Sequence, residues 1–165
     1  MNGRRNLDAV GLLRTLTEAS VEFILIGGTA AQMLGLPVPQ TIDVDIVPLR
    51  TAQNLEKLAE FFDAVEAALL TAEEDGTWFP RRPFGNWSQY DTLHLLTNFG
   101  LLDLVFFPSG VINGYEGLHG DSSIVDFNGV RVRMISEEQW VHLKTSAGRE
   151  KDIDHLRRYF SSRRR

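Results

Sequence analysis

The chain has no cysteine among its 165 residues. This excludes disulfide bonds and metal sites built from thiolates, and it fits a reducing compartment. No apolar run approaches the ~20 residues that a membrane-spanning helix needs. The N-terminal residues also lack the apolar core of a signal peptide. We therefore expect a cytoplasmic protein with no membrane association.

A surplus of positive charge is missing as well. The 17 Lys and Arg are outnumbered by 22 Asp and Glu, and the net charge is −5. A chain of this charge is not one that coats nucleic acid non-specifically. Five arginines nevertheless crowd the C-terminus: Arg157, Arg158, Arg163, Arg164 and Arg165. They form either a solvated helix end or a tail that faces phosphate or RNA.

What the chain has is enough apolar material for one core. Hydrophobic residues make up 43% of it, with ten Phe and three Trp, which is ordinary for a globular domain. The length predicts a single domain, 1–165, that includes C-terminal helices expected at about 137–160.

Periodicity predicts the order of helices and strands. Helices are expected near 5–19, at 29–34, after Thr51, after Ser136 and at about 149–160. Strands are expected at 23–26, 42–46, 92–97, 101–107, 123–127 and 130–135. Asn128-Gly129 predicts a hairpin between the last two. This order is typical of an α+β fold, a mixed β-sheet flanked by helices.

Three further expectations concern loops and one helix face. Residues 71–91 and 108–121 are rich in glycine and proline, and we expect long loops there. In the first loop, Trp78, Arg81, Arg82 and Trp87 either stack a base and bind phosphate or pack on the domain. In the last helix, Ile153, Leu156 and Phe160 are expected to face inward.

Two carboxylates alternate with apolar residues in the second strand, at Asp43 and Asp45. Residues i and i+2 of a strand point to the same face, so the two side chains should project side by side. Like charges this close repel, and a bound cation would neutralise them. The alternative is an exposed face or an edge strand.

Asp103 stands among large apolar neighbours in another predicted strand. A carboxylate there is costly unless it is paired or metal-bound. If the two strands are adjacent, the three carboxylates converge, and hard oxygen ligands suit Mg²⁺ or Mn²⁺. Such metals can support phosphoryl-type transfer. The alternative for Asp103 is a salt bridge to an arginine.

Gly27-Gly28-Thr29 lies where a strand meets a helix. Glycines let the backbone approach a phosphate, and N–H groups at a helix start point toward it. Alone, the tripeptide equally describes a tight turn with a capping Thr. Neither the dinucleotide-binding nor the P-loop glycine pattern is present, and the Asp-x-Asp that follows strengthens the phosphate interpretation.

These residues resemble a known signature. Gly27-Gly28-Thr29 followed by Thr41-x-Asp43-x-Asp45 is similar to the motif of the nucleotidyltransferase superfamily with a DNA-polymerase-β-like fold, and Leu102-Asp103-Leu104 resembles its third-carboxylate strand. Downstream positions resemble small AbiEii-like bacterial nucleotidyltransferases, some of which are toxins of toxin–antitoxin systems. These positions are Asn128-Gly129-Val130-Arg131-Val132, Ser136, Lys144, Ala147-Gly148-Arg149 and Lys151-Asp152. The chain departs in having Thr29 where Ser is commoner, and in lacking the C-terminal extension of longer members.

The resemblance implies a role for each matched residue. Asp43, Asp45 and Asp103 would bind Mg²⁺ or Mn²⁺ with a nucleoside triphosphate, and Asp103 would also suit a base for the acceptor hydroxyl. Gly27, Gly28 and Thr29 would hold the β- and γ-phosphates, while Lys144, Arg149 and Lys151 would neutralise their charge. The alternatives are a solvated Lys144 and a surface network of Arg149, Lys151 and Asp152. His94 is expected to be structural.

The implied activity is transfer of a nucleoside monophosphate from an NTP to a hydroxyl of tRNA, a protein or a small molecule. The protein could work with a cognate antitoxin or another partner protein. Two alternatives stay open: a non-catalytic nucleotide- or partner-binding module of the same fold, and a metal-dependent phosphohydrolase.

Overall fold

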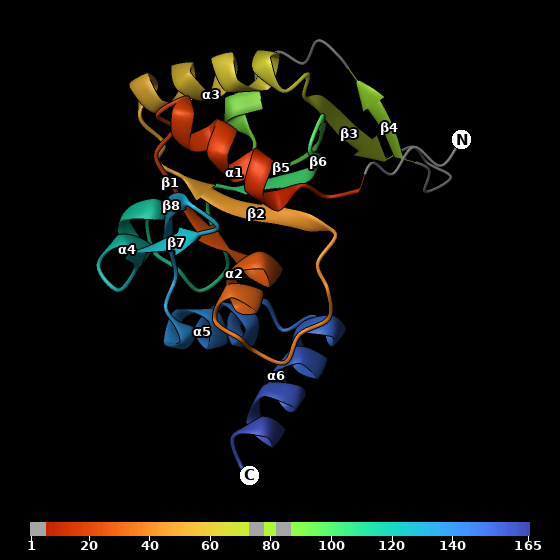
Figure 1. Cartoon of the computed structure of the whole chain (residues 1–165), viewed down its shortest axis with the longest axis vertical. Helices are drawn as coiled ribbons and strands as arrows, with labels where there is room; N and C mark the ends of the chain where they lie inside the picture. The colour runs from red at the N-terminus through yellow and green to blue at the C-terminus, as the bar shows by residue number, and fades with distance from the viewer. Residues whose placement is uncertain (1–5, 73–77, 82–86) are drawn as a thin grey trace.

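The computed structural model describes residues 6–72, 78–81 and 87–165 (Figure 1). Its strands are β1 Phe23–Ile26, β2 Asp43–Pro48, β3 Ala68–Ala72, β4 Trp78–Arg81, β5 Thr92–Thr97, β6 Gly100–Val105, β7 Ser123–Phe127 and β8 Val130–Met134. Its helices are α1 Ala9–Glu18, α2 Gly27–Met33, α3 Ala52–Ala64, α4 Tyr115–His119, α5 Glu137–Ala147 and α6 Glu150–Ser162. A 3₁₀ turn spans Trp87–Gln89.

Within the described residues, the eight strands form one mixed sheet in the order β4-β3-β5-β6-β2-β1-β8-β7. Helices α1 and α3 cover one face of this sheet, and α2 and α5 lie on the other side (Figure 1). The predicted α+β fold, a mixed sheet flanked by helices, is confirmed. None of the helices in the described ranges is long and apolar enough to cross a membrane.

The register around β2 positions the acidic residues. β2 runs parallel to β6, with Asp45 paired to Asp103. Val44 and Ile46 are fully buried, whereas Asp43 and Asp45 face the opposite side of the sheet. The predicted alternation is confirmed for these residues. Ile42, which precedes the strand, is 59% exposed and does not join the core.

Local signals place the ends of several elements. The Asn128-Gly129 turn has positive φ at both residues, as a two-residue hairpin of the primed type requires. Ser136 and Gln139 form the predicted capping box at the start of α5. Gly148 ends α5 in the left-handed conformation, with φ +61°.

Two regions expected to be loops contain regular structure. β4 lies within the first of them, together with the end of β3 and the 3₁₀ turn. β4 contains Pro80 but is an edge strand, where a missing N–H is tolerated. The second predicted loop contains α4. Residues 73–77 and 82–86, and with them Arg82, lie outside the described part of the chain, as do the side chains of Trp78 and Arg81.

The predicted inward stripe of the last helix is wrong in part. Leu156 packs against the core, but Ile153 and Phe160 are 49% and 50% exposed. Figure 1 shows the reason, because α6 leaves α5 and projects away from the sheet. Periodicity identified an apolar face, although only part of the helix has a neighbour to cover it.

Candidate active site

Three carboxylates meet on the sheet face that α2 and α5 cover. Side-chain oxygens of Asp43, Asp45 and Asp103 lie within 4.8 Å of one another. Parallel pairing of the strands brings Asp45 beside Asp103. Asp43 lies on the same face as Asp45, because side chains two residues apart in a strand point the same way. The predicted convergence is therefore confirmed. All the ligand atoms are carboxylate oxygens, which fits a hard divalent cation such as Mg²⁺ or Mn²⁺.

The electrostatics of this cluster favour an added positive charge. Burial, together with the charges of Asp43 and Asp103, raises the pKa of Asp45 to about 8. Burial also raises the pKa of Asp103, against the opposing effect of the hydrogen bond from His94. The cluster therefore retains a proton at neutral pH when no cation is bound, and a bound cation would displace it.

Two threonines hold the strand that carries the acidic pair. Thr41 Oγ1 lies 2.9 Å from the carbonyl oxygen of Asp43 and 3.1 Å from its Oδ1. Thr29 is 2% exposed, and its Oγ1 donates to the same carbonyl oxygen at 3.3 Å. Thr41 lines the pocket described below and Thr29 does not. The hydroxyl of Thr29 thus joins α2 to β2, and its predicted contact with phosphate stays a prediction.

Gly27 and Gly28 allow α2 to begin directly against the carboxylates. Gly27 has φ +70°, and a Cβ there would lie 2.1 Å from Asp45 Oδ2. A Cβ at Gly28 would lie 3.0 Å from the side chain of Thr41. Any larger residue at Gly27 would therefore clash with Asp45 and strain the backbone. Both glycines line the pocket.

His94, which the sequence predicts to be a structural residue, contacts one of the three carboxylates. Its Nδ1 lies 2.8 Å from Asp103 Oδ1, so the imidazole donates to the carboxylate in its ionised form. The contact follows from the β5–β6 hairpin, in which His94 pairs with Asp103. Counting back from the Thr97–Gly100 pair at the turn would have found it.

Opposite the carboxylates, two cations share one buried carboxylate. Asp152 is fully buried; Lys144 Nζ donates to its Oδ1 at 2.9 Å, and Arg149 Nε donates to its Oδ2 at 2.7 Å. Burial alone would raise the pKa of Asp152, but the hydrogen bonds from Arg149 and Lys144 lower it overall. The expected alternative of a surface network fails for Asp152, since this residue is the buried centre of the cluster.

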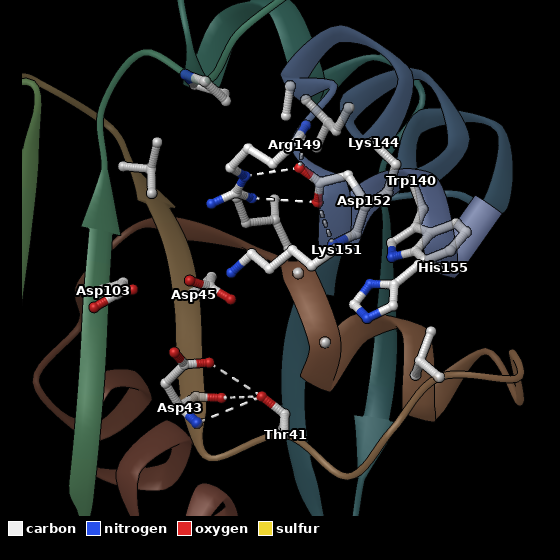
Figure 2. Close-up of a pocket in the computed structure, with 18 of the residues that line it drawn as sticks. Thr41, Asp43, Asp45, Asp103, Trp140, Lys144, Arg149, Lys151, Asp152 and His155 are labelled. Atoms are coloured by element: carbon white, nitrogen blue, oxygen red, sulfur yellow. Dashed lines mark hydrogen bonds and ion pairs between the residues drawn. The ribbon is translucent and has the colours of Figure 1, made fainter. Parts of the chain in front are cut away.

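Lys151 is arranged differently. In Figure 2 its side chain extends across the pocket toward Asp45, and its charge lowers the pKa of Asp45. Within the described ranges it has no ion-pair partner. Its ammonium group is therefore available to an anion bound between the two walls.

Both walls line one pocket of about 600 Å³, within the usual range for a small-molecule or cofactor site. One wall carries the carboxylates on β2 and β6, and the other carries the cations near the α5–α6 junction (Figure 2). Of the predicted site residues, Gly27, Gly28, Asp43, Asp45, Asp103, Lys144, Arg149 and Lys151 line it. It also contains Asp152, which the resemblance matched without assigning it a role, and residues that no motif indicated, among them Trp140 and His155.

Trp87, one of the residues considered for base stacking, has a different environment. Its ring packs edge-on against Phe62, with the two ring centroids 4.9 Å apart, and it does not line the pocket. The packing alternative therefore describes Trp87.

Two proteins with solved structures that share this arrangement of elements are nucleotidyltransferases by description or activity. TM1012, a predicted nucleotidyltransferase of Thermotoga maritima, aligns with a TM-score of 0.56 and 13% identity, covering 93% of this chain and 90% of its own. At such identity the likeness defines the fold, and the fold is that of the nucleotidyltransferases.

The antibiotic-resistance factor ANT(2'')-Ia has the same fold. Its solution structure aligns with a TM-score of 0.56 and 16% identity, covering 92% of this chain and 80% of that one. A crystal structure of ANT(2'')-Ia in complex with adenylyl-2''-tobramycin aligns with a TM-score of 0.55 and 15% identity. The alignment covers 92% of this chain and 84% of that one. No protein-family model and no curated protein matches the sequence.

Proposed function

We propose that this protein is a metal-dependent nucleotidyltransferase that transfers a nucleoside monophosphate from an NTP to a hydroxyl acceptor. The observation that carries the proposal is the two-walled pocket. Three carboxylates within 4.8 Å of one another face Lys144 and Lys151 across it. An NTP–metal complex has the matching charges, because its metal needs oxygen ligands and its phosphates need cations.

On the acidic wall, Asp43, Asp45 and Asp103 would hold Mg²⁺ or Mn²⁺. The bound metal would stabilise negative charge on the reacting phosphate. The acceptor oxygen attacks the α-phosphorus, the bond to the leaving pyrophosphate breaks, and a carboxylate oxygen of Asp103 takes the hydroxyl proton.

On the other side, the protein would hold the β- and γ-phosphates. Gly27 and Gly28 line the pocket without side chains, so the backbone is open to a phosphate oxygen. Lys151 reaches toward the acidic wall, while Asp152 holds Lys144 and Arg149 in place. Thr29 keeps its predicted role only if its hydroxyl is released from Asp43 when nucleotide binds.

Two resemblances point to different classes of acceptor. The resemblance to AbiEii-like proteins supports tRNA or a protein as acceptor and a toxin–antitoxin role with a cognate antitoxin. The shared fold of ANT(2'')-Ia, solved with adenylyl-2''-tobramycin, supports a small molecule. Each of these acceptors presents a hydroxyl group, which is all that the proposed chemistry needs.

The test is incubation of the protein with each NTP labelled at the α-phosphate, Mg²⁺, and separated tRNA, protein and small-molecule fractions of a cell extract. We expect label in one fraction and release of pyrophosphate, both abolished in Asp103→Asn. Asp63→Asn, an exposed substitution on α3, is the control and should keep full activity.

Other results would contradict the proposal. Full activity in Asp103→Asn would rule out the proposed site. Release of inorganic phosphate in place of pyrophosphate would indicate a phosphohydrolase. Tight NTP binding by calorimetry without transfer to any fraction would indicate a binding module of the same fold.

A further inference from the structure

Two polar atoms in the pocket wall have no hydrogen-bond partner. Within the described residues, the buried side-chain nitrogens without one are Trp140 Nε1 and His155 Nδ1. Both residues line the pocket, and Trp140 is only 1% exposed. Buried donors in native proteins are nearly always paired, so two orphans on one wall of one pocket require an explanation.

The position of Trp140 connects its indole to the cationic wall. Trp140 precedes Lys144 by one turn of α5, so the two side chains share a face of the helix. Lys144 Nζ lies 5.9 Å from the centroid of the Trp140 ring. Figure 2 shows Trp140 and His155 on the same wall as Asp152, across the pocket from β2. A group bound near Lys144 is thus close to the ring of Trp140.

The chemistry of the two atoms restricts what can bind there. The indole N–H is only a donor, so its partner must be an acceptor. Burial and the nearby charge of Lys144 lower the pKa of His155, and the neutral ring has one N–H to donate. Lys144 and Lys151 favour a negative ligand. An anion with several acceptor oxygens, such as a chain of phosphates, meets all of these conditions.

We propose that Trp140 Nε1 and His155 Nδ1 are hydrogen-bond donors to the β- and γ-phosphates of the bound nucleotide. This inference rests on the proposed function, which orients the nucleotide with its α-phosphate at the carboxylates. It makes Trp140 a ligand-binding residue as well as a core residue. It also narrows the substrate class, because a nucleoside monophosphate oriented in this way has no β- or γ-phosphate to accept these hydrogen bonds.

The direct test observes the indole N–H in the intact chain. The protein has three tryptophans, so a ¹H–¹⁵N spectrum contains three indole signals, which Trp140→Phe and Trp87→Phe assign. On titration with Mg²⁺ and inorganic pyrophosphate, the Trp140 signal should move downfield. The Trp87 signal should stay, since that ring packs on Phe62 outside the pocket. Nucleoside monophosphates should leave both signals unchanged.

Affinity gives a second measurement. Trp140→Phe keeps an aromatic ring in the core and removes the donor, so pyrophosphate binding should weaken roughly tenfold, as for a lost hydrogen bond to a charged group. His155→Phe should weaken it in the same direction. Trp87→Phe is the matched control and should bind pyrophosphate as the unmodified protein does.

The outcomes separate this inference from the proposed function. If pyrophosphate binds but the Trp140 signal does not move, or Trp140→Phe binds equally well, the inference is wrong and the proposed function stands. If nucleoside monophosphates move the Trp140 signal as pyrophosphate does, the inferred orientation of the nucleotide, with its α-phosphate at the carboxylates, is wrong. If neither pyrophosphate nor any NTP binds, both are wrong. Should Trp140→Phe fail to fold, the indole signal of the unmodified protein still decides.

Discussion

The two walls of the pocket differ in how their charges are balanced. On the acidic wall, Asp43, Asp45 and Asp103 lie together, and the pKa values of Asp45 and Asp103 are raised. On the cationic wall, Lys144 and Arg149 both pair with Asp152, whose pKa is lowered. The first wall has no positive charge of its own to balance its carboxylates, whereas on the second wall one carboxylate holds two cations and part of the positive charge stays unbalanced.

This difference assigns different tasks to the two walls. A cluster of unbalanced carboxylates costs stability, and a divalent cation removes that cost. A cation held by a buried carboxylate is fixed in place but attracts an anion less strongly. The acidic wall is therefore suited to binding a divalent cation. The cationic wall is suited to holding its positive side chains in fixed positions. Lys151 is the exception, because it lies on the cationic side without a partner in the described residues.

The largest expected effect comes from removing one charge of the acidic wall. Asp45→Asn should lower transfer activity by roughly 10³-fold, because the wall no longer holds the metal. The same change should stabilise the metal-free protein above pH 8 by about 1–2 kcal/mol, roughly 2–8 °C in Tm, since it relieves repulsion. Thermal unfolding with EDTA and with Mg²⁺ measures both states.

The pH dependence of stability gives the sign of the contribution that Asp45 makes to the metal-free protein. A raised folded-state pKa means that the metal-free protein loses stability as pH rises from near 3.8 to about 8. That slope should be smaller in Asp45→Asn and should diminish when Mg²⁺ is added to the unmodified protein. A slope that is the same in the two proteins would contradict the description of the acidic wall.

The next largest effect is expected at Asp152, the centre of the cationic wall. Asp152→Ala leaves Lys144 unpaired where it is mostly buried, so unfolding should require ~3 kcal/mol less free energy. Asp154→Ala is the matched control, because Asp154 pairs with Arg157 on the surface, and the cost should be below ~1 kcal/mol. Denaturant titration measures both. Because the pKa of Asp152 is lowered, its stabilisation is present above pH 3.8 and is lost as pH falls below that value.

A substitution at the start of α2 tests how closely that helix depends on the acidic wall. Gly27→Ala and Gly35→Ala both place Cβ at φ +70°, but only at Gly27 does it meet Asp45. Each should lose about 1 kcal/mol of stability from backbone strain. Gly27→Ala should also lose roughly 100-fold in activity, because Asp45 is displaced. Equal activity in the two variants would show that the helix start and Asp45 are independent.

The smallest effect is expected beside the site. His94→Gln removes the imidazole that donates to Asp103 at 2.8 Å. Mn²⁺ affinity should fall by about tenfold, as when a group that orients a metal ligand is replaced. His142→Gln, which alters a contact with the Gly110 carbonyl oxygen instead, should leave Mn²⁺ affinity unchanged. Calorimetric titration with Mn²⁺ compares the two.

Local patterns allowed much of the acidic wall to be predicted. The alternation around Asp43 and the isolation of Asp103 among apolar residues are properties of short segments, and each survives in the fold. The pairing of β2 with β6 joins strands far apart in sequence, so the sequence predicts convergence of the three carboxylates only on condition that these strands are adjacent. The contact of His94 with Asp103 could have been predicted, because a hairpin turn sets the register of both strands.

The cationic wall was less accessible to prediction. Asp152 becomes buried only because α5 and α6 meet at Gly148 and turn two cations toward it. Trp140 and His155 lack partners because of their surroundings, which no local spacing reveals. The error at Ile153 and Phe160 has the same origin, since a sequence period identifies an apolar face without identifying its neighbour.

The register of β2 against β6 has a consequence for how this protein can change over evolutionary time. Because side chains alternate along a strand, inserting or deleting one residue within β6 before Asp103 would turn that carboxylate into the core. The Asn128-Gly129 hairpin lies at the far side of the sheet from β6 and carries no such constraint. Lineages of this fold should therefore vary freely in length at such turns, while the spacing from Gly100 to Asp103 stays constant.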